Sequence, residues 1–332
     1  MPMIIPQTAF NMLKTHTLAP KLWAFLDNAE AEELFPVDVY ELSGKWGVPD
    51  RQVLSLFLQA AETGVFELVW ADTCNACGGD TLRGDSYSRE QTCMHCGESF
   101  RPYADIHRKA LFSVHPDVYQ DTVPAGSMRA KTRPGVPAID CLMTPSFRCG
   151  QGYGLIPPGT SLEIRNASVL FFTDLRLRGL YETLEDTEAY AEGYRILSAA
   201  DSSVREEGGS VFRFAFDTAV ALFRDSHSAV NAAVRIRGRS EAEGGGESGM
   251  ISIHAGPVLA VNYGEKVGFS GRTLADIAAV HTKLKHRHIS LSGQAYGDPK
   301  AAAAFEAYAG GSIRTRIVLK AAGRELVMYR GR

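Results

Sequence analysis

The sequence contains no long apolar run and no marked excess of positive or negative charge. No segment approaches the roughly 18 consecutive apolar residues of a membrane-spanning helix, so we expect no membrane association. The formal net charge of −3 gives no general attraction to nucleic acid or to anionic lipid. Residues 1–7 show no basic stretch leading into an apolar core, so we expect no secretory signal and a cytoplasmic protein.

Cysteine is scarce, with six residues in 332, and four of the six are clustered. Cys74 and Cys77 form one C-x-x-C pair, and Cys93 and Cys96 form a second pair after a fifteen-residue spacer. In a cytoplasmic protein such a set points to metal binding before disulfides. Four thiolates at this spacing can surround one ion tetrahedrally, so we predict a structural Zn²⁺ site with no open position for catalysis. A redox-active set of cysteines is the alternative interpretation.

The residues around these cysteines are typical of a metal knuckle. Gly78 and Gly97 directly follow the two pairs, where the backbone of such a turn needs a permissive residue. We expect His95, which lies between two of the cysteines, to face solvent and not to act as a fifth ligand. Cys141 and Cys149 stand apart, and we expect them to be small buried residues. A second metal site that uses them is the alternative, although no partner pair is visible.

Residues 1–70 have the pattern of several helices followed by a strand. Asp50 is expected to cap the last of these helices, and Val65–Trp70 alternates like a strand. The order of helix, tight turn, helix and strand is that of a winged helix-turn-helix. The apolar residues at helical spacing are Leu22, Phe25 and Leu26, then Val39, Leu42 and Trp46, and then Val53, Leu56, Phe57 and Ala60.

A winged helix raises the question of DNA binding. A recognition helix needs basic and amide side chains for phosphates and base edges, and the candidate helix offers only Arg51 and Gln52 before it becomes apolar. Its surroundings are acidic, with Glu33, Asp38 and Glu41 nearby. We therefore do not expect DNA binding and favour a structural or protein-contact role. A transcription factor remains an alternative class.

These signals divide the chain into four segments. We predict a helical, winged-helix-like domain in 1–70 and a zinc ribbon in 71–105. Recurring proline and glycine predict a connection of short strands and irregular segments in 106–165. Residues 166–332 have the pattern of a separate α+β domain.

The last segment predicts the order β-α-β-β-α-β with additional elements, and hence a sheet covered by helices on one face. Strand alternation in the hairpin places Val211, Arg213 and Asp217 on one face and the phenylalanines 212, 214 and 216 on the core face. We expect Arg239–Gly249 to be a mobile loop. The other expected elements are strand Ser168–Asp174, a helix from Asp186 to Gly208, strand Ala219–Phe223, helix Ser226–Arg237, a strand, tight turn and strand in Met250–Val261, helix Thr273–Lys285, strand His288–Ser292 and a final pair in Arg316–Tyr329.

Four segments of this region, in order and spacing, resemble a class III adenylate/guanylate cyclase domain. They are Leu170–Leu175, Gly208–Phe223, Ile253–Val258 and Gly268–Ala279. The resemblance implies a ferredoxin-like fold and a head-to-tail dimer with its active sites at the interface. The N-terminal helices and the cysteine module also resemble the uncharacterised domain that precedes such cyclase domains in some bacterial proteins.

The resemblance assigns metal binding to Asp174 and Asp217. In this family two aspartates hold two Mg²⁺ or Mn²⁺ ions, which activate the ribose hydroxyl and hold the triphosphate. Two incidental acids at the ends of strands are the alternative interpretation.

Other positions depart from the family's pattern. The phosphate-binding glycine turn is replaced by Arg176–Gly179, and a glycine before the second aspartate is replaced by Phe216. Arg213 and Arg272 stand at the two positions that read the purine in the family. Lys320 lies near the position of the family's phosphate-binding lysine, and a surface lysine is the alternative interpretation. The candidate nucleotide ligands are therefore Arg176, Arg178, Arg213, Arg272 and Lys320.

The most consequential departures are Ala275 and Ala279, which stand where the family has its transition-state asparagine and arginine. Loss of one such group costs ~10²–10³ in rate. The resemblance therefore implies a catalytically impaired regulatory protein that acts through dimerisation, nucleotide sensing or partner binding. The alternative is an active cyclase that makes cAMP or cGMP from ATP or GTP with two Mg²⁺. Such activity could depend on a heterodimer with a complete cyclase domain.

Overall fold

The computed structural model describes most of the chain, and its contacts divide the chain into two compact units. Unit 1 comprises Met1–Leu162 and Asn262–Val267, and unit 2 comprises Glu163–Val261 and Gly268–Arg332. No helix in the described part of the chain has both the length and the apolar content needed to cross a membrane. The predictions for Cys149 and Phe216 lie outside the described residues, as does much of the expected connection 106–165. The described residues are 3–82, 90–103, 107–115, 117–119, 136–143, 156, 161–215, 217–242, 249–263, 267–284, 288–310, 315–321 and 324–331.

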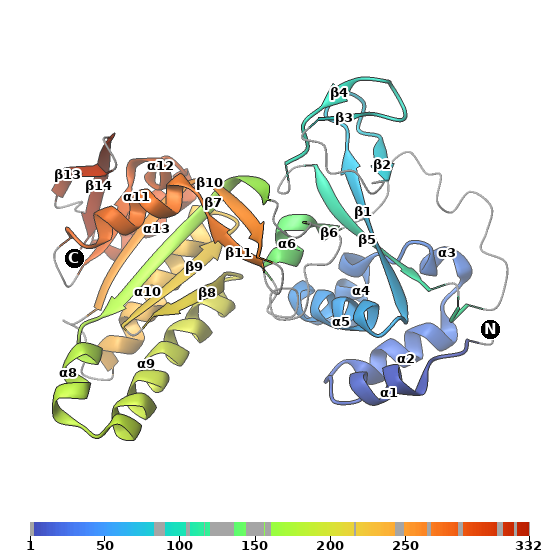
Figure 1. Cartoon of the computed structure of the whole chain (residues 1–332), viewed down its shortest axis with the longest axis horizontal. Coiled ribbons are helices and arrows are strands. Elements are labelled where there is room, and N and C mark those ends of the chain that lie inside the picture. Colours follow the sequence, from blue (N-terminus) through green and yellow to red (C-terminus); the bar gives the residue numbers. More distant parts are fainter. Residues whose placement is uncertain are drawn as a thin grey trace. The chain divides into compact units, whose positions relative to one another are not determined.

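Unit 1 consists of helices packed on a four-stranded sheet in the order β2-β1-β5-β6, with a separate hairpin formed by β3 and β4 (Figure 1). The helices are α1 (Gln7–Leu13), α2 (Ala19–Asn28), α3 (Ala31–Leu34), α4 (Val39–Trp46), α5 (Asp50–Glu62) and α6 (Ala138–Leu142). The strands are β1 (Phe66–Thr73), β2 (Asp80–Leu82), β3 (Gln91–Thr92), β4 (Ser99–Phe100), β5 (Arg108–Val114) and β6 (Val136–Pro137).

Helix α5, the candidate recognition helix, packs into the core of unit 1. The ring of Phe57 packs against Phe66 of β1 and Phe112 of β5, and Arg51 donates a hydrogen bond to the carbonyl of Met143. The expected cap at Asp50 is wrong, because this residue is the first of the helix and Pro49 precedes it without a side-chain cap. The winged-helix assignment stays a prediction. The buried residues of the helix are Val53, Leu54, Leu56, Phe57, Leu58 and Ala60.

A buried ion pair joins the two central strands of unit 1. Asp72 of β1 and Arg108 of β5 lie directly opposite each other in the antiparallel register. The Arg108 Nε lies 2.6 Å from Asp72 Oδ1, and its Nη2 lies 2.8 Å from Oδ2. The two side chains are only 2% and 0% exposed. Asp72 lies two residues before Cys74 in the sequence. The ion pair therefore holds the end of β1 that leads into the first C-x-x-C turn.

Unit 2 has a central sheet in the order β13-β14-β12-β10-β7-β9-β8, with β11 paired to β10. Its first part runs β7-α8-α9-β8-β9-α10-β10, and these strands lie in the order β10-β7-β9-β8, so the predicted α+β class is confirmed. The strands are β7 (Ser161–Asp174), β8 (Ser210–Ala215), β9 (Thr218–Phe223), β10 (Gly249–Asn262), β11 (Val267–Ser270), β12 (Ile289–Ser292), β13 (Thr315–Ala321) and β14 (Arg324–Gly331). The helices are α8 (Arg176–Thr183), α9 (Asp186–Glu206), α10 (Ser226–Ala242), α11 (Arg272–His281), α12 (Gly293–Tyr296) and α13 (Pro299–Tyr308).

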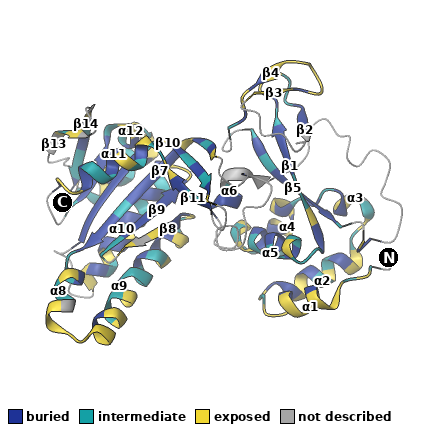
Figure 2. Cartoon of the chain, in the orientation of Figure 1, coloured by how far each residue is buried: buried dark blue, intermediate teal, exposed yellow. Residues whose placement is uncertain are grey.

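Helices lie on both faces of this sheet, not on one face as the sequence predicted. Phe172 of β7 shares a buried apolar cluster with Ile196 of α9, Ile236 of α10 and Phe305 of α13. The neighbouring residue Thr173 points to the opposite face, where its hydroxyl meets His281 of α11. Figure 2 shows the central strands as mostly buried. Both faces of the sheet near β7 are therefore covered within one chain.

Two local expectations in unit 2 are wrong. The segment Gly256–Pro257 forms no turn but lies within the single strand β10. A Cβ at Gly256 would lie 2.6 Å from the hydroxyl of Thr273, which donates to the Pro257 carbonyl, so the glycine permits a close approach of α11. Helix α10 continues past Arg237 to Ala242, and Arg239 in this additional turn donates a hydrogen bond to Ser203 of α9 (Nη1–Oγ 2.8 Å). The rest of the expected mobile loop, 243–248, lies outside the described residues.

Candidate functional site

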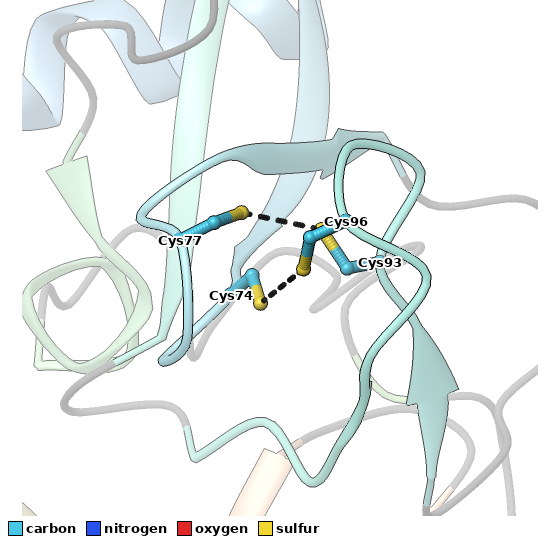
Figure 3. Close-up of side chains that lie close together, drawn as sticks. All are labelled: Cys74, Cys77, Cys93 and Cys96. Carbon is cyan, nitrogen blue, oxygen red and sulfur yellow. Dashed lines mark hydrogen bonds between the residues drawn. The ribbon is translucent and has the colours of Figure 1, made fainter.

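Cys74, Cys77, Cys93 and Cys96, hereafter the cysteine cluster, converge in unit 1 (Figure 3). Their sulfur atoms all lie within 4.8 Å of one another. The Cys74 and Cys96 sulfurs are 3.8 Å apart, and the Cys77 and Cys93 sulfurs are 3.6 Å apart. A tetrahedron with Zn–S bonds of ~2.3 Å has edges of ~3.8 Å. The donor set and its geometry therefore fit a metal ion.

Two backbone turns of the same form position the sulfurs. The amide of Gly78 donates to the carbonyl of Cys74, and the amide of Gly97 donates to the carbonyl of Cys93 (2.9 and 3.0 Å). Both glycines have positive φ, 69° and 73°, which L-residues with a side chain rarely adopt. Each turn also directs a backbone amide at a sulfur, from Gly79 to Cys77 (3.4 Å) and from His95 to Cys93 (3.3 Å). The local sequence thus produces two matching halves of one site.

His95 does more than face solvent. Its Nε2 lies 2.8 Å from the carbonyl of Asp80, and its ring covers Gly79, where a Cβ would meet the ring at 2.4 Å. The residue is exposed, as predicted, but it also bonds one turn of the cluster to the other. Cys141 is fully buried outside the cluster, and burial is the main factor that raises the pKa of its thiol. It behaves as a small core residue.

The two aspartates with predicted metal roles are neighbours in unit 2. Asp174 is the last residue of β7, and Asp217 lies in the turn between β8 and β9. The backbone amide of Asp174 donates to the carbonyl of Asp217 (3.0 Å), which extends the β7–β9 ladder by one bond. The side chain of Asp174 is fully buried and that of Asp217 is 13% exposed. The fold therefore brings together two acids that are 43 positions apart in the sequence (217 − 174).

Each aspartate is paired with an arginine from the first turn of α8. Arg176 Nη2 lies 2.6 Å from Asp174 Oδ2, and its Nε and backbone amide both donate to Oδ1 (3.1 and 3.0 Å). Arg178 Nε lies 2.5 Å from Asp217 Oδ2. The sequence predicted a shortened turn with two phosphate ligands here. In the structure these residues begin helix α8, and their arginines form ion pairs with the two aspartates.

The ion pair determines the charge state of Asp217. Burial acts to raise the pKa of this carboxyl, but the hydrogen bonds from Arg178 and Thr218 outweigh it, and the net pKa is lowered. The group is therefore an anion at neutral pH.

Between Asp174 and the helices α9 and α10 lies a cavity of about 10 Å³, which has room for about one water and not for a nucleotide.

Arg213 lies on β8, but not as strand alternation predicted. The register pairs Val211 with Ala221 and Arg213 with Val220, so Phe212 is the extra residue of a β-bulge. Val211 consequently faces the core while Arg213 is exposed. The side chains of Phe214 and Phe216 lie outside the described residues.

The remaining candidates lie elsewhere. Arg272 begins α11 and is exposed, and Ala275 and Ala279 follow on the same helix. Lys320 is exposed on β13. Strands β14, β12 and β10 lie between β13 and β7. At about 4.8 Å per strand, Lys320 is roughly 19 Å away from the strand that carries Asp174 in the same chain.

His281 lies near the acid pair, and no motif in the sequence selects it. Its ring is buried between the hydroxyls of Thr173 (Nε2–Oγ1 2.9 Å) and Ser252 (Nδ1–Oγ 2.6 Å). Burial lowers its pKa to about 4, although the charge of Asp217 acts in the opposite direction, so the ring is neutral at pH 7. The sequence signal was only a histidine at the end of an apolar helix stripe.

Comparisons with known proteins give one family match. Residues 6–124 match a family of unknown function, DUF5939, which covers less than half of the chain. No curated protein matches the sequence.

The structural neighbours are class III adenylyl and guanylyl cyclase domains. They include the adenylyl cyclase CyaB from P. aeruginosa (15% identity, 52% of this chain and 95% of that chain, TM-score 0.41). Others are the guanylyl cyclase domain of the RhoGC fusion protein from the aquatic fungus Blastocladiella emersonii (17%, 52% and 97%, 0.41) and an adenylate/guanylate cyclase/hydrolase from Silicibacter pomeroyi (16%, 52% and 98%, 0.41).

Proposed function

We propose that this chain is a cytoplasmic regulatory protein whose cyclase-like domain does not cyclise nucleotides by itself. The observation that carries the proposal is the pairing of Asp174 with Arg176 and of Asp217 with Arg178. Two-metal catalysis needs carboxylates that are open to divalent ions. Here each carboxylate already has a positive partner, so a metal ion would have to displace a guanidinium group that is covalently tethered nearby.

Helix α11 supports the same proposal. Ala275 and Ala279 stand where the resemblance places the groups that stabilise the transition state, and neither side chain can donate a hydrogen bond or supply a charge. A homodimer of this chain would therefore lack these groups at both interface sites. A heterodimer with a complete cyclase domain is the second candidate function, and it would require release of Arg176 and Arg178 before this chain could supply its two aspartates.

The cysteine cluster belongs to the proposal as a structural Zn²⁺ site. Zn²⁺ fits because four thiolates leave it no open position and the sulfur geometry is close to tetrahedral. A bound Zn²⁺ would stabilise the two C-x-x-C turns. The apolar side chains of α5 are buried in the core of unit 1, so we propose that unit 1 contacts protein and not DNA.

The purified chain is expected to form no cAMP or cGMP from ATP or GTP with Mn²⁺ or Mg²⁺, because its acids are neutralised and its transition-state groups are absent. Product analysis by mass spectrometry measures this directly. Robust product that disappears in the Asp217→Ala variant contradicts the proposal. Product that forms only after addition of a complete cyclase domain with a disabled acid pair supports the heterodimer instead.

Removal of both arginines is expected to expose a divalent-ion site. In the double variant Arg176→Ser/Arg178→Ser, the two carboxylates lose their partners, and Mn²⁺ binding by isothermal titration should strengthen by about tenfold or more relative to the unaltered chain. The matched control is Arg195→Ser, since Arg195 pairs with Glu192 on the exposed face of α9. Equal Mn²⁺ affinity in all three proteins would show that the arginines do not compete with metal.

A further inference from the structure

A continuous chain of hydrogen bonds joins Asp217 to the interior of unit 2. Its members come from β9, β7, α11 and β10 in turn, and each contact is at most 2.9 Å. Thr173 and Thr218 meet because they are the last directly opposed pair of the β7–β9 ladder. The order of groups is Asp217 Oδ1, Thr218 Oγ1, Thr173 Oγ1, His281 Nε2 and Nδ1, and Ser252 Oγ.

The direction of every bond follows from the number of protons available. The Asp217 carboxylate can only accept, so the single hydroxyl proton of Thr218 is directed at it. Thr218 must then accept from Thr173, whose own single proton is thereby used. Thr173 can in turn only accept from the His281 ring, which places a proton on Nε2.

The number of available protons also determines the direction of the last bond in the chain, between His281 and Ser252. A neutral imidazole with its proton on Nε2 has an acceptor at Nδ1, so the Ser252 hydroxyl donates to it. All four donors therefore point toward Asp217. Bonds aligned in one direction in a low-dielectric interior strengthen one another. The ring of Phe171 packs against His281 (centroids 5.5 Å apart), and His281 and Ser252 are both buried, which keeps this end of the chain away from water.

The chain passes through the C-terminal end of helix α11. His281 is the last residue of that helix, and Thr273 near its start is held by the Pro257 carbonyl. Between these two contacts lie Ala275 and Ala279. The C-terminal end of α11 is therefore held by a bond whose direction depends on an anion several groups away.

We infer that His281 is a positioning residue that couples α11 to the Asp217 carboxylate through this one-way hydrogen-bond chain. Removal of the Asp217 carboxylate, or of the Thr218 hydroxyl, takes away the acceptor that orients the remaining bonds and frees the His281 proton to move from Nε2 to Nδ1. Helix α11 thereby senses the state of the acid pair. The inference does not depend on nucleotide binding or turnover.

Nitrogen NMR of the full-length chain labelled at histidine tests this inference, because the ¹⁵N shifts of the two ring nitrogens distinguish the tautomers. The unaltered protein at pH 7 is expected to hold His281 as the Nε2–H tautomer. In Thr218→Val and in Asp217→Ala, at least about half of His281 should convert to the Nδ1–H tautomer. Thr218→Ser restores the hydroxyl and should restore the original signal.

His254 is an internal control in the same spectrum. It is also buried and hydrogen-bonded, but its partner is Ser292 and it lies outside the chain. A change in His281 with no change in His254 supports the coupling. Retention of the Nε2–H tautomer in both Thr218→Val and Asp217→Ala, in folded protein, would overturn it, as would an Nδ1–H signal in the unaltered protein.

Discussion

Replacement of both Cys74 and Cys93 by serine is expected to abolish metal binding and to unfold the turns of unit 1. These are the two buried members of the cysteine cluster, one from each C-x-x-C pair. Structural Zn²⁺ sites in small modules contribute about 10–16 kcal/mol of binding free energy near neutral pH, much of which is folding free energy. Elemental analysis should fall from about one metal ion per chain to none, and the thermal unfolding midpoint should fall with it.

Cys141→Ala is the matched control, because Cys141 is equally buried but lies outside the cluster. It is expected to keep the full metal content. If the double serine variant retains one ion per chain, or if the unaltered protein purified without chelators contains none, the cluster is not a metal site. Disulfides found in the freshly purified protein would instead favour the redox interpretation.

Asp72→Ala is expected to destabilise unit 1 by about 3–5 kcal/mol, the cost of leaving a buried charge without its partner. The Arg108 side chain is 2% exposed, and its Nε and Nη2 both donate to the Asp72 carboxylate, so removal of this carboxylate leaves a buried positive charge without its partner. Urea unfolding at neutral pH, followed by far-ultraviolet circular dichroism, measures the change.

The double replacement Asp72→Leu/Arg108→Met tests whether the loss of stability comes from the unpaired charge of Arg108. Buried ion pairs replaced by apolar residues of similar size are often neutral or stabilising. We therefore expect the double variant to recover most of the stability that Asp72→Ala loses. A double variant as unstable as the single one would indicate that the pair is needed for a specific hydrogen-bond geometry and not only for charge balance.

The pairing of acids with arginines changes what the cyclase resemblance implies. From the sequence, Asp174 and Asp217 were retained metal ligands and Arg176 and Arg178 were replacement phosphate ligands. In the structure the four residues form two ion pairs. A metal ion or a phosphate group that bound at this site would therefore have to break one of the two ion pairs.

Periodicity in the sequence predicted many of the secondary elements but not their exceptions. The apolar stripe that starts at Val53 predicted α5, yet the burial of Phe57 also depends on Phe112, which is far along the chain. The bulge at Phe212 could not be read from alternation, because a bulge depends on the register of the partner strand. Gly256–Pro257 has the composition of a turn, and only the approach of Thr273 explains its place in a strand.

The sequence by itself determined the features that depend on neighbours along the chain. The C-x-x-C turns are local, since each needs only a few residues and one glycine at positive φ, and the β-α-β-β-α-β order follows from periodic patterns. The tertiary structure alone decided which side chains meet across the fold. Arg178 and Asp217 are 39 positions apart, and Thr173 and His281 are 108 apart. The free energy of such pairs depends on burial and on the direction of each hydrogen bond, which the completed sheet and helices set.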